Sequence, residues 1–303
     1  MKCGIVDVGS NTMRLSVYHY EGRQFKLLMN KKEMAGLASY IQDGALSDSG
    51  ILVACRVLSN FKALLENLDI GQIYVFGTAP LRNISNTEDA LDTIQTITGL
   101  RVDVLSGADE AKFSFLGATS DEHTPSSGLL VDIGGGSTEL VAYQDWEVRS
   151  ECSLPMGSLS LYSKYVSGLF PTPEERRAIR DQVERELHRA KTAGLTCSHV
   201  TGVGGTVRAA AKLCNRLADA DPDNRIIPAA DIRSLYKNLK KGDVKTLRQI
   251  LLSTPDRVHT VLPGLAILTT VLKFYEADTV SASSCGVREG YLLSRIMGVE
   301  SRA

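Results

Sequence analysis

Two stretches of the chain place an aspartate just before a turn of glycine and hydroxyl residues. One surrounds Asp7 and the other surrounds Asp132, and in both an apolar run precedes the aspartate and another follows the turn. Such turns can point several backbone N–H groups at one phosphate group. The two aspartates are 125 positions apart (132 − 7), which excludes a short-period repeat. The pattern therefore predicts one phosphate-binding device used twice.

A third glycine turn occupies residues 202–206 and leads directly into a helix predicted at 206–217. The positive end of that helix would add to an anion site. Any one glycine turn could be purely structural, but three in one chain, two of them behind an aspartate, favour phosphate binding. The chain has neither a Walker phosphate-binding motif nor a dinucleotide-binding glycine motif.

Carboxylates at these turns suit Mg²⁺, which takes one or two protein carboxylates together with substrate phosphates and water. Asp7 and Asp132 end predicted strands, although each could instead cap its own turn. Glu139 lies just inside the next strand, where we expect it to face a cleft rather than the core.

Two further features stay open from the pattern alone. Asp109 and Glu110 begin a predicted helix, where acidic residues are favoured for purely electrostatic reasons. Arg82 is either an ordinary surface charge or a phosphate ligand.

Composition describes an ordinary globular chain of 303 residues, 43% hydrophobic and 23% charged, with a formal charge of −1. A chain of this length favours two domains. The balanced charge argues against a protein that coats DNA. The six cysteines are scattered without a C-x-x-C pair, which argues against zinc and favours reduced, mostly buried thiols.

The chain begins directly with a strand pattern, without the features of a signal peptide. Its longest strongly apolar stretch, residues 264–272, is too short to span a bilayer. We therefore expect a cytoplasmic protein with no membrane partner.

Each half of the chain opens with three predicted strands and then alternates helices with strands, which predicts two related α/β domains facing one another across a cleft. The pattern predicts a helix over 48–68 capped at Ser47 or Asp48, and one from Asn86 or Thr87 to Thr98 that Gly99 ends. It also predicts continuous helices over 231–252 and 287–297, and a domain boundary in residues 118–127.

Seven motifs, in order along residues 4–290, resemble those of the exopolyphosphatase / guanosine pentaphosphate phosphohydrolase (Ppx/GppA) family. This family is a branch of the superfamily of sugar kinases, heat-shock chaperones and actin. The motifs are VDVGSNTMRL, GTAPLRN, SGADEA followed by LGA, VDIGGGSTELV, GVGGTVR, LPG and SSCGVREG. The resemblance covers nearly the whole chain, and DIGGGSTE combined with SGADEA is its most specific part.

The resemblance implies an α/β protein of two actin-like (ribonuclease H-like) domains facing across a central cleft. Residues 1–117 would form the first domain, with one phosphate loop and the catalytic glutamate. Residues 118–303 would form the second, with the last helix packing back on the first. Longer relatives carry a further C-terminal domain, so the resemblance implies a short two-domain form.

The resemblance also implies roles for single residues. Glu110 would be the catalytic base, and Asp132 and Glu139 would serve Mg²⁺ or Mn²⁺, with Asp7 at the matching position of the first turn. The implied phosphate ligands are Asn11, Thr12, Arg82, Gly134, Gly135, Gly136, Ser137, Gly205 and Thr206, and Arg14 and Arg288 would line the path of the polyanion. This chain departs from the family at His259, where an acidic residue often follows the arginine that corresponds to Arg257.

The implied activity is release of a terminal phosphate from inorganic polyphosphate or guanosine pentaphosphate, with a place in the stringent response and a homodimer as the expected assembly. A short form favours short chains or the nucleotide as substrate. Two alternatives are a kinase of the same superfamily and an actin-like scaffold. Residues 281–290 offer little surface for adenine, which disfavours the kinase, and Glu110 disfavours a catalytically silent scaffold.

Overall fold

A computed structural model describes residues 1–121, 123–190, 192 and 194–299 as two compact units. The first unit contains residues 1–110 together with 291–299, and the second contains residues 111–290. The chain passes from the first unit to the second inside helix α4 (Gly107–Ala118), whereas the sequence predicted domains of 1–117 and 118–303.

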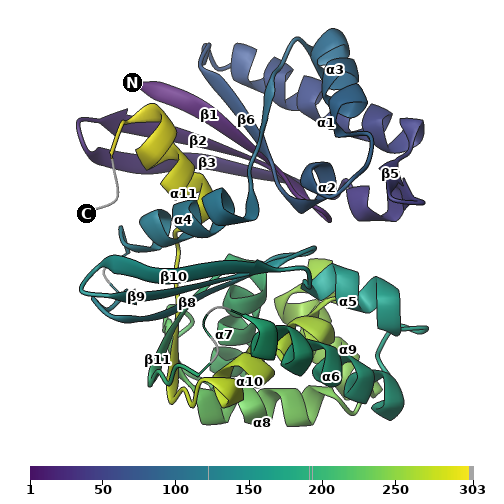
Figure 1. Cartoon of the computed structure of the whole chain (residues 1–303), viewed down its shortest axis with the longest axis vertical. Coiled ribbons are helices and arrows are strands. Elements are labelled where there is room, and N and C mark those ends of the chain that lie inside the picture. Colours follow the sequence, from purple (N-terminus) through teal and green to yellow (C-terminus); the bar gives the residue numbers. More distant parts are fainter. Residues whose placement is uncertain (122, 191, 193, 300–303) are drawn as a thin grey trace. The chain divides into compact units, whose positions relative to one another are not determined.

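The first unit is built on a five-stranded sheet in the order β3-β2-β1-β6-β7. Strand β1 pairs antiparallel with β2 and parallel with β6, and helices α1 and α3 lie along the sheet (Figure 1). Its elements are β1 (Lys2–Val8), β2 (Met13–Glu21), β3 (Gln24–Glu33), η1 (Leu37–Tyr40), β4 (Ile41–Gln42), β5 (Ala45–Leu46), α1 (Asp48–Glu66), β6 (Ile73–Gly77), α2 (Ala79–Arg82), α3 (Thr87–Thr98), β7 (Val102–Val104), the start of α4 and the π-helix η3 (Leu292–Ile296).

The second unit is built on a six-stranded sheet in the order β10-β9-β8-β11-β13-β12. Its elements are the rest of α4, β8 (Gly128–Ile133), β9 (Thr138–Gln144), β10 (Glu147–Leu154), α5 (Ser158–Tyr165), α6 (Pro173–Arg189), β11 (His199–Val203), α7 (Gly204–Ala218), β12 (Ile226–Pro228), α8 (Ala229–Leu239), α9 (Val244–Ser253), η2 (Pro255–Arg257), α10 (Val261–Phe274), β13 (Thr279–Ala282) and most of α11 (Val287–Tyr291).

The two sheets repeat one plan. In each, three strands form an antiparallel meander, and the first of these pairs in parallel with a later strand. Strands β3-β2-β1-β6-β7 of the first unit match β10-β9-β8-β11-β13 of the second, and only the second adds an edge strand, β12. The predicted α/β class and the predicted duplication are both confirmed.

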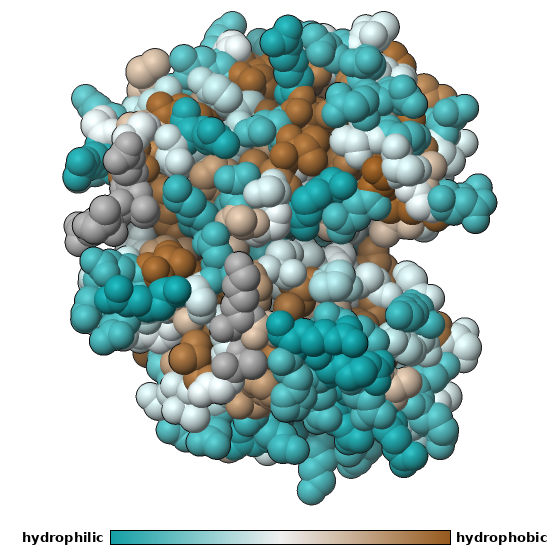
Figure 2. Space-filling model, in the orientation of Figure 1, coloured by the Kyte–Doolittle hydropathy of each residue, from teal (hydrophilic) through white to brown (hydrophobic). Residues whose placement is uncertain are grey.

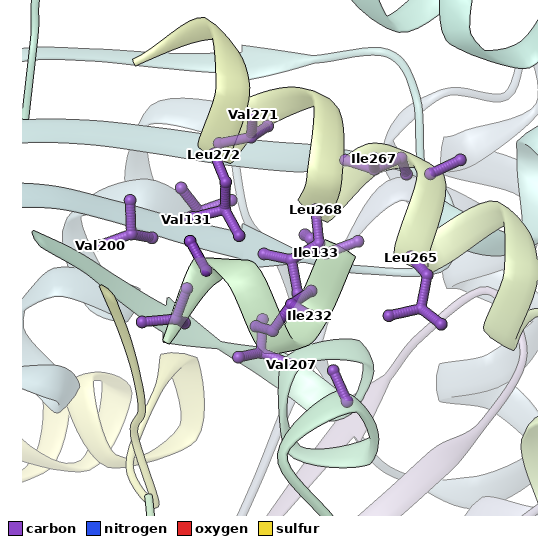
Figure 3. Close-up of a cluster of buried hydrophobic side chains, with 14 of the residues drawn as sticks. Val131, Ile133, Val200, Val207, Ile232, Leu265, Ile267, Leu268, Val271 and Leu272 are labelled. Atoms are coloured by element: carbon purple, nitrogen blue, oxygen red, sulfur yellow. The ribbon is translucent and has the colours of Figure 1, made fainter. Parts of the chain in front are cut away.

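Helix α10 is the centre of the core in the second unit. Most of its residues are buried, and it packs against α5, α6, α7 and α8. Leu265, Leu268 and Leu272 meet the sheet residues Val131 and Ile133 in one apolar cluster (Figure 3). A helix that is apolar on all sides is typical of a protein interior. In the described part of the chain, no helix has both the length and the apolarity needed to cross a membrane.

Helix ends follow the local sequence signals. Ser47 caps α1 by accepting a hydrogen bond from the amide of Gly50, and Gly99 ends α3 in the left-handed conformation at φ 70°, both as predicted. The predicted helix over 231–252 is wrong. It is two helices, because Gly242 adopts φ 64° and Asp243 caps α9 by accepting from the amide of Thr246. The predicted helix over 287–297 is α11 followed by a π-helix.

The six cysteines are free, as predicted. Cys3, Cys55 and Cys214 are buried, and the other three are half-buried.

Leu268→Ala is expected to lower the free energy of unfolding by about 2 to 5 kcal/mol, because the fully buried side chain would leave a cavity beneath α10. Urea unfolding monitored by circular dichroism measures this change. Leu252→Ala is the matched control, since that side chain is 54% exposed and its loss should change stability by less than about 0.5 kcal/mol. Equal effects of the two substitutions would contradict the assignment of α10 as the core helix.

Candidate functional site

The turn between β8 and β9, residues 134–137, has its carbonyl groups held by the first turn of α5. The amide of Ser158 donates to the carbonyl of Gly134 at 2.9 Å, and the next two amides donate to the carbonyl of Gly135 at 2.9 Å each. Gly157 permits this approach, because a Cβ there would collide with the backbone of Gly135 and Gly136. The turn is therefore fixed with its carbonyls directed at α5.

The amides of the same turn have no such partners. Among the residues that the structure describes, none accepts a hydrogen bond from the amides of Gly135, Gly136 or Ser137. The amide of Gly134 closes the turn by donating to the carbonyl of Ser137 at 3.0 Å. Successive unpaired amides in one turn form an anion-binding concavity. The free amides are therefore compatible with an anion at this turn, and the phosphate ligands predicted in residues 134–137 stay a prediction.

Two carboxylates flank the turn and face each other across the strands. Asp132 and Glu139 are directly opposite in the antiparallel pairing of β8 with β9, and they are only 7% and 1% exposed. Each accepts a short hydrogen bond from a serine: Ser114 Oγ donates to Asp132 Oδ2 at 2.6 Å, and Ser153 Oγ donates to Glu139 Oε1 at 2.7 Å. The serines orient the pair without neutralising its charge.

Burial raises the pKa of Asp132, while the hydrogen bond from Ser114 and the charges of Arg208 and Arg288 act to lower it. Arg208 is held in place by donating from Nη1 to the carbonyl of Ser283 at 3.1 Å. The net direction shows that desolvation is stronger than the nearby positive charges. The ionised form of Asp132 therefore lowers the stability of the folded protein unless a further cation binds beside it.

The two carboxylates fit Mg²⁺ better than a metal held entirely by protein. In the described residues, no three histidine, cysteine or acidic side chains gather closely enough to form a complete ligand set. Mg²⁺ needs only one or two carboxylates when water and substrate phosphates supply the rest. An opposed buried pair matches that requirement.

The start of α7 forms a second anion-binding surface next to Asp132. Gly204 has φ 87°, and a Cβ there would lie 2.6 Å from Asp132 Oδ1, so only glycine brings the helix so close. No side chain caps this helix, and in the described chain the buried Oγ1 of Thr206 has no hydrogen-bond partner. An uncapped helix start with an unpaired hydroxyl favours an anionic ligand.

Arg257 lies over the same helix start, and sequence reasoning did not assign it to the site. Its guanidinium occupies the space that a side chain on Gly205 would need. Burial lowers the pKa of Arg257, with Asp256 acting in the opposite direction. A desolvated cation at the positive end of a helix is favourable only if an anion joins it. One indication of an unusual role for Arg257 was present in the sequence. His259 stands two positions after Arg257, where the family often has an acidic residue.

The first unit contains its own version of the turn, in residues 9–12. The amide of Gly9 donates to the carbonyl of Thr12 at 3.2 Å, and the carbonyl of Asn11 accepts from Gly36 at 2.9 Å. Asn11 and Thr12 are half-buried. Asp7 lies directly opposite Arg14 across β1 and β2, so here the aspartate has a cation as its neighbour rather than a second acid.

Glu110 is also in the first unit, where it is paired with Arg82. The carboxylate is 8% exposed, and Arg82 Nη1 donates to Glu110 Oε2 at 2.8 Å and to the carbonyl of Leu105 at 3.0 Å. Asp109 instead accepts from Ser106 Oγ at 2.7 Å. The two neighbouring acids, which the sequence could not separate, therefore have different partners.

Within the second unit, the structure brings together the opposed carboxylates, the turn 134–137, the start of α7 and the charge of Arg288. Within the first unit, it brings together the predicted base and the predicted ligand Arg82. Sequence reasoning missed Ser114, Ser153, Arg208 and Arg257. Arg208 and Ser114 lie inside or beside the quoted motifs, but only the fold shows which side chains they approach.

Comparisons with known proteins identify the family of the chain. The Ppx/GppA phosphatase family matches residues 16–297. A guanosine-5'-triphosphate,3'-diphosphate pyrophosphatase of Vibrio vulnificus is 26% identical over 295 residues, covering 94% of this chain and 57% of that protein. The chain thus spans little more than half of that relative, whereas it spans 90% of a Haemophilus influenzae relative that is 25% identical over 292 residues.

Solved structures agree as well. The crystal structure of an exopolyphosphatase from Cytophaga hutchinsonii covers 100% of both chains with a TM-score of 0.87 at 22% identity, a likeness that shows the fold. The Aquifex aeolicus PPX-GPPA enzyme covers 97% of this chain and 99% of its own, with a TM-score of 0.77 and 26% identity. The actin-like fold that the motifs implied is confirmed.

Asp132→Asn is expected to make the folded protein more stable at neutral pH. The raised pKa of Asp132 means that its ionisation costs folding free energy, and this cost is absent below its ordinary pKa of about 3.9 and grows as the pH rises above that value. The asparagine keeps an acceptor for Ser114 and carries no charge. Thermal unfolding at pH 4 and pH 7.5 measures the effect.

The variant should therefore melt above the wild type at pH 7.5, and the difference should shrink at pH 4. If the variant melts below the wild type at pH 7.5, the ionised carboxylate is not a source of strain.

Proposed function

The chain belongs to the Ppx/GppA phosphatase family, and from this premise we propose that it hydrolyses the terminal phosphoanhydride bond of inorganic polyphosphate or guanosine pentaphosphate. The names of its relatives support both substrates, since one is named as an exopolyphosphatase and another as a guanosine-5'-triphosphate,3'-diphosphate pyrophosphatase. Polyphosphate and guanosine pentaphosphate share one reacting group, a terminal phosphate on a phosphoanhydride.

One observation carries this proposal. The unpaired amides of the turn 134–137 and the uncapped start of α7 both adjoin the buried carboxylate pair of Asp132 and Glu139. Amide donors bind phosphate oxygens, and carboxylates bind the divalent cation that accompanies them. A site that offers both in one place fits a phosphate ester or anhydride bound with its metal.

We assign the metal to Asp132 and Glu139, with Mg²⁺ or Mn²⁺ as the ion. When bound, it would neutralise charge on the phosphate oxygens. Asp7, which the sequence also predicted as a metal ligand, already has Arg14 opposite it, and we expect it to contribute less. Ser114 and Ser153 would keep the two carboxylates oriented, and Gly204 would leave room for them.

The proposed phosphate ligands are the amides of the turn 134–137, Gly205, Thr206 and, as an addition from the structure, Arg257. Thr206 Oγ1 supports this role because it is buried with no partner in the described residues. In the first unit, we propose Asn11, Thr12 and Arg82 as further ligands, with Arg14 and Arg288 acting on the polyanion by charge.

We propose Glu110 as the base that accepts a proton from the attacking water. Phosphoryl transfer passes through a loose transition state, so positioning and charge stabilisation supply most of the catalysis. What remains is to orient a water molecule and take its proton. Arg82 supports this role, because its hydrogen bond to Glu110 Oε2 at 2.8 Å holds the carboxylate in one orientation.

We also propose a cytoplasmic enzyme that acts in the stringent response as a homodimer, with no DNA or membrane partner. The balanced charge supports the absence of a DNA partner, and the nucleotide in the name of the Vibrio vulnificus relative supports the role in the stringent response.

Phosphate release from polyphosphate and from guanosine pentaphosphate, with Mg²⁺ and without ATP, tests the proposed function. We expect release from at least one of the two substrates and its loss in excess EDTA, because the opposed carboxylates need a cation. ATP with glycerol or a sugar is the control for a kinase. Transfer of phosphate from ATP to the sugar, without phosphate release from polyphosphate or guanosine pentaphosphate, would contradict the proposed function.

Glu110→Gln is expected to lower kcat by roughly 10²- to 10⁴-fold, the usual contribution of a general base, with KM little changed. The substitution keeps the hydrogen bond to Arg82 and removes the basicity, so the fold around it is preserved. Steady-state phosphate release measures both constants.

Asp109→Asn is the matched control one residue away. Its carboxylate accepts from Ser106 and makes no contact with Arg82, so kcat should change by less than about tenfold. If the Asp109 variant is the damaged one and the Glu110 variant is active, the base has been assigned to the wrong carboxylate.

A further inference from the structure

A pocket of about 270 Å³ lies in the second unit among α6, α8 and α10. Four of its nine lining residues are cations, and none is acidic: Arg176, Arg177 and Arg180 come from α6, and Lys240 follows α8. Figure 2 shows hydrophilic side chains gathered over these helices in the lower part of the molecule. Tyr236, half-buried, adds a phenol group to the same wall.

These cations are only partly compensated by other groups. Arg177 and Lys240 have no carboxylate within ion-pair distance among the residues that the structure describes. Arg180 makes two long ion pairs, at 3.5 Å to Asp181 and 4.0 Å to Glu184, and neither acid lines the pocket. Arg176 and Arg180 are four residues apart, where like charges on a helix repel each other. An anion in the pocket would relieve this repulsion.

The pocket is partly preorganised for such a ligand. Arg176 is half-buried, and its Nη1 donates to the carbonyl of Pro171 at 2.6 Å, which fixes the guanidinium. Burial raises the pKa of Tyr236, against the opposing effect of Arg176 and Arg180, so its hydroxyl keeps its proton and can donate it. Thr269 and Thr270 supply hydroxyl groups from α10.

The volume of the pocket favours a ligand that is smaller than most drug-sized molecules. Pockets for drug-sized molecules span roughly 300 to 1,000 Å³, so this pocket lies just below that range. Two or three linked phosphate groups would carry enough charge to meet the four cations of the pocket.

We propose that this pocket is an anion site for a small condensed phosphate, either free pyrophosphate or the end of a polyphosphate chain. It is separate from the turn 134–137 and the start of α7, since none of those residues lines it. The proposal does not depend on the hydrolytic activity.

Isothermal titration with pyrophosphate, in EDTA, tests the site in the full chain. The variant Arg177→Gln/Lys240→Gln removes the two unpaired cations, and it should bind pyrophosphate about tenfold more weakly or worse, since bonds to charged groups are the stronger ones. The control Arg185→Gln/Lys237→Gln removes the same charge from α6 and α8 at positions that do not line the pocket. It should bind as the wild type does, because any binding at the catalytic loops is common to all three proteins.

A second titration with long-chain polyphosphate distinguishes the two sources of the ligand. Loss of affinity for both ligands in the pocket variant supports free pyrophosphate, and loss for the long chain alone supports a chain end. Equal affinities of the pocket and control variants for both ligands would overturn the proposal. Phosphate release at saturating substrate should be unchanged in both variants, so failure of this site can be told apart from failure of the proposed function.

Discussion

The second unit depends on the burial of two carboxylates beside its glycine turn. Asp132 and Glu139 are directly opposite on β8 and β9 and almost fully buried, so ionisation of either side chain carries a desolvation cost. Serines, arginines and the bare backbone of Gly204 surround the pair, yet the pKa of Asp132 remains raised. The proposed divalent cation would offset the free-energy cost of ionising buried Asp132. The neighbouring amides would then bind the phosphate oxygens that accompany that cation.

The first unit shows the same backbone turn with only one acidic residue in the matching pair of opposed residues. Its turn closes with the same amide-to-carbonyl hydrogen bond, and its carbonyls are held by η1 as those of the other turn are held by α5. When Asp7 is aligned with Asp132, an offset of 125 positions, Arg14 of the first unit corresponds to Glu139 of the second (14 + 125 = 139). An aspartate opposite an arginine is already compensated, so this copy can present amides to an anion without requiring a metal. The two copies of the turn thus differ in the charge of the residue opposite the aspartate, arginine in one and glutamate in the other.

Whether a feature could be predicted from the sequence depends on how far apart in the chain its interacting residues lie. The turns, the strands around them and the caps at Ser47 and Gly99 are local, so a pattern of nearby residues was enough to predict them. The break at Gly242 was equally local and was overlooked, because the apolar spacing continues on both sides of it. Ser114 and Arg257 reach Asp132 and Gly205 from 18 and 52 positions away (132 − 114 and 257 − 205), and only the folded chain brings them together. Burial of Asp132, the source of its raised pKa, is likewise a property of the fold.

The chemistry of the donors also explains how one site can serve two kinds of substrate. The turn 134–137 and the start of α7 offer backbone amides, the hydroxyl of Thr206 and the guanidinium of Arg257. These groups recognise phosphate oxygens by charge and hydrogen bonding, and none has the edge-specific pattern that identifies a nucleobase. At the proposed site, a terminal phosphate would therefore meet the same donors whether it ends an inorganic chain or a nucleotide. Discrimination between the two must come from contacts with the rest of the substrate, which explains why one family can include enzymes named for both.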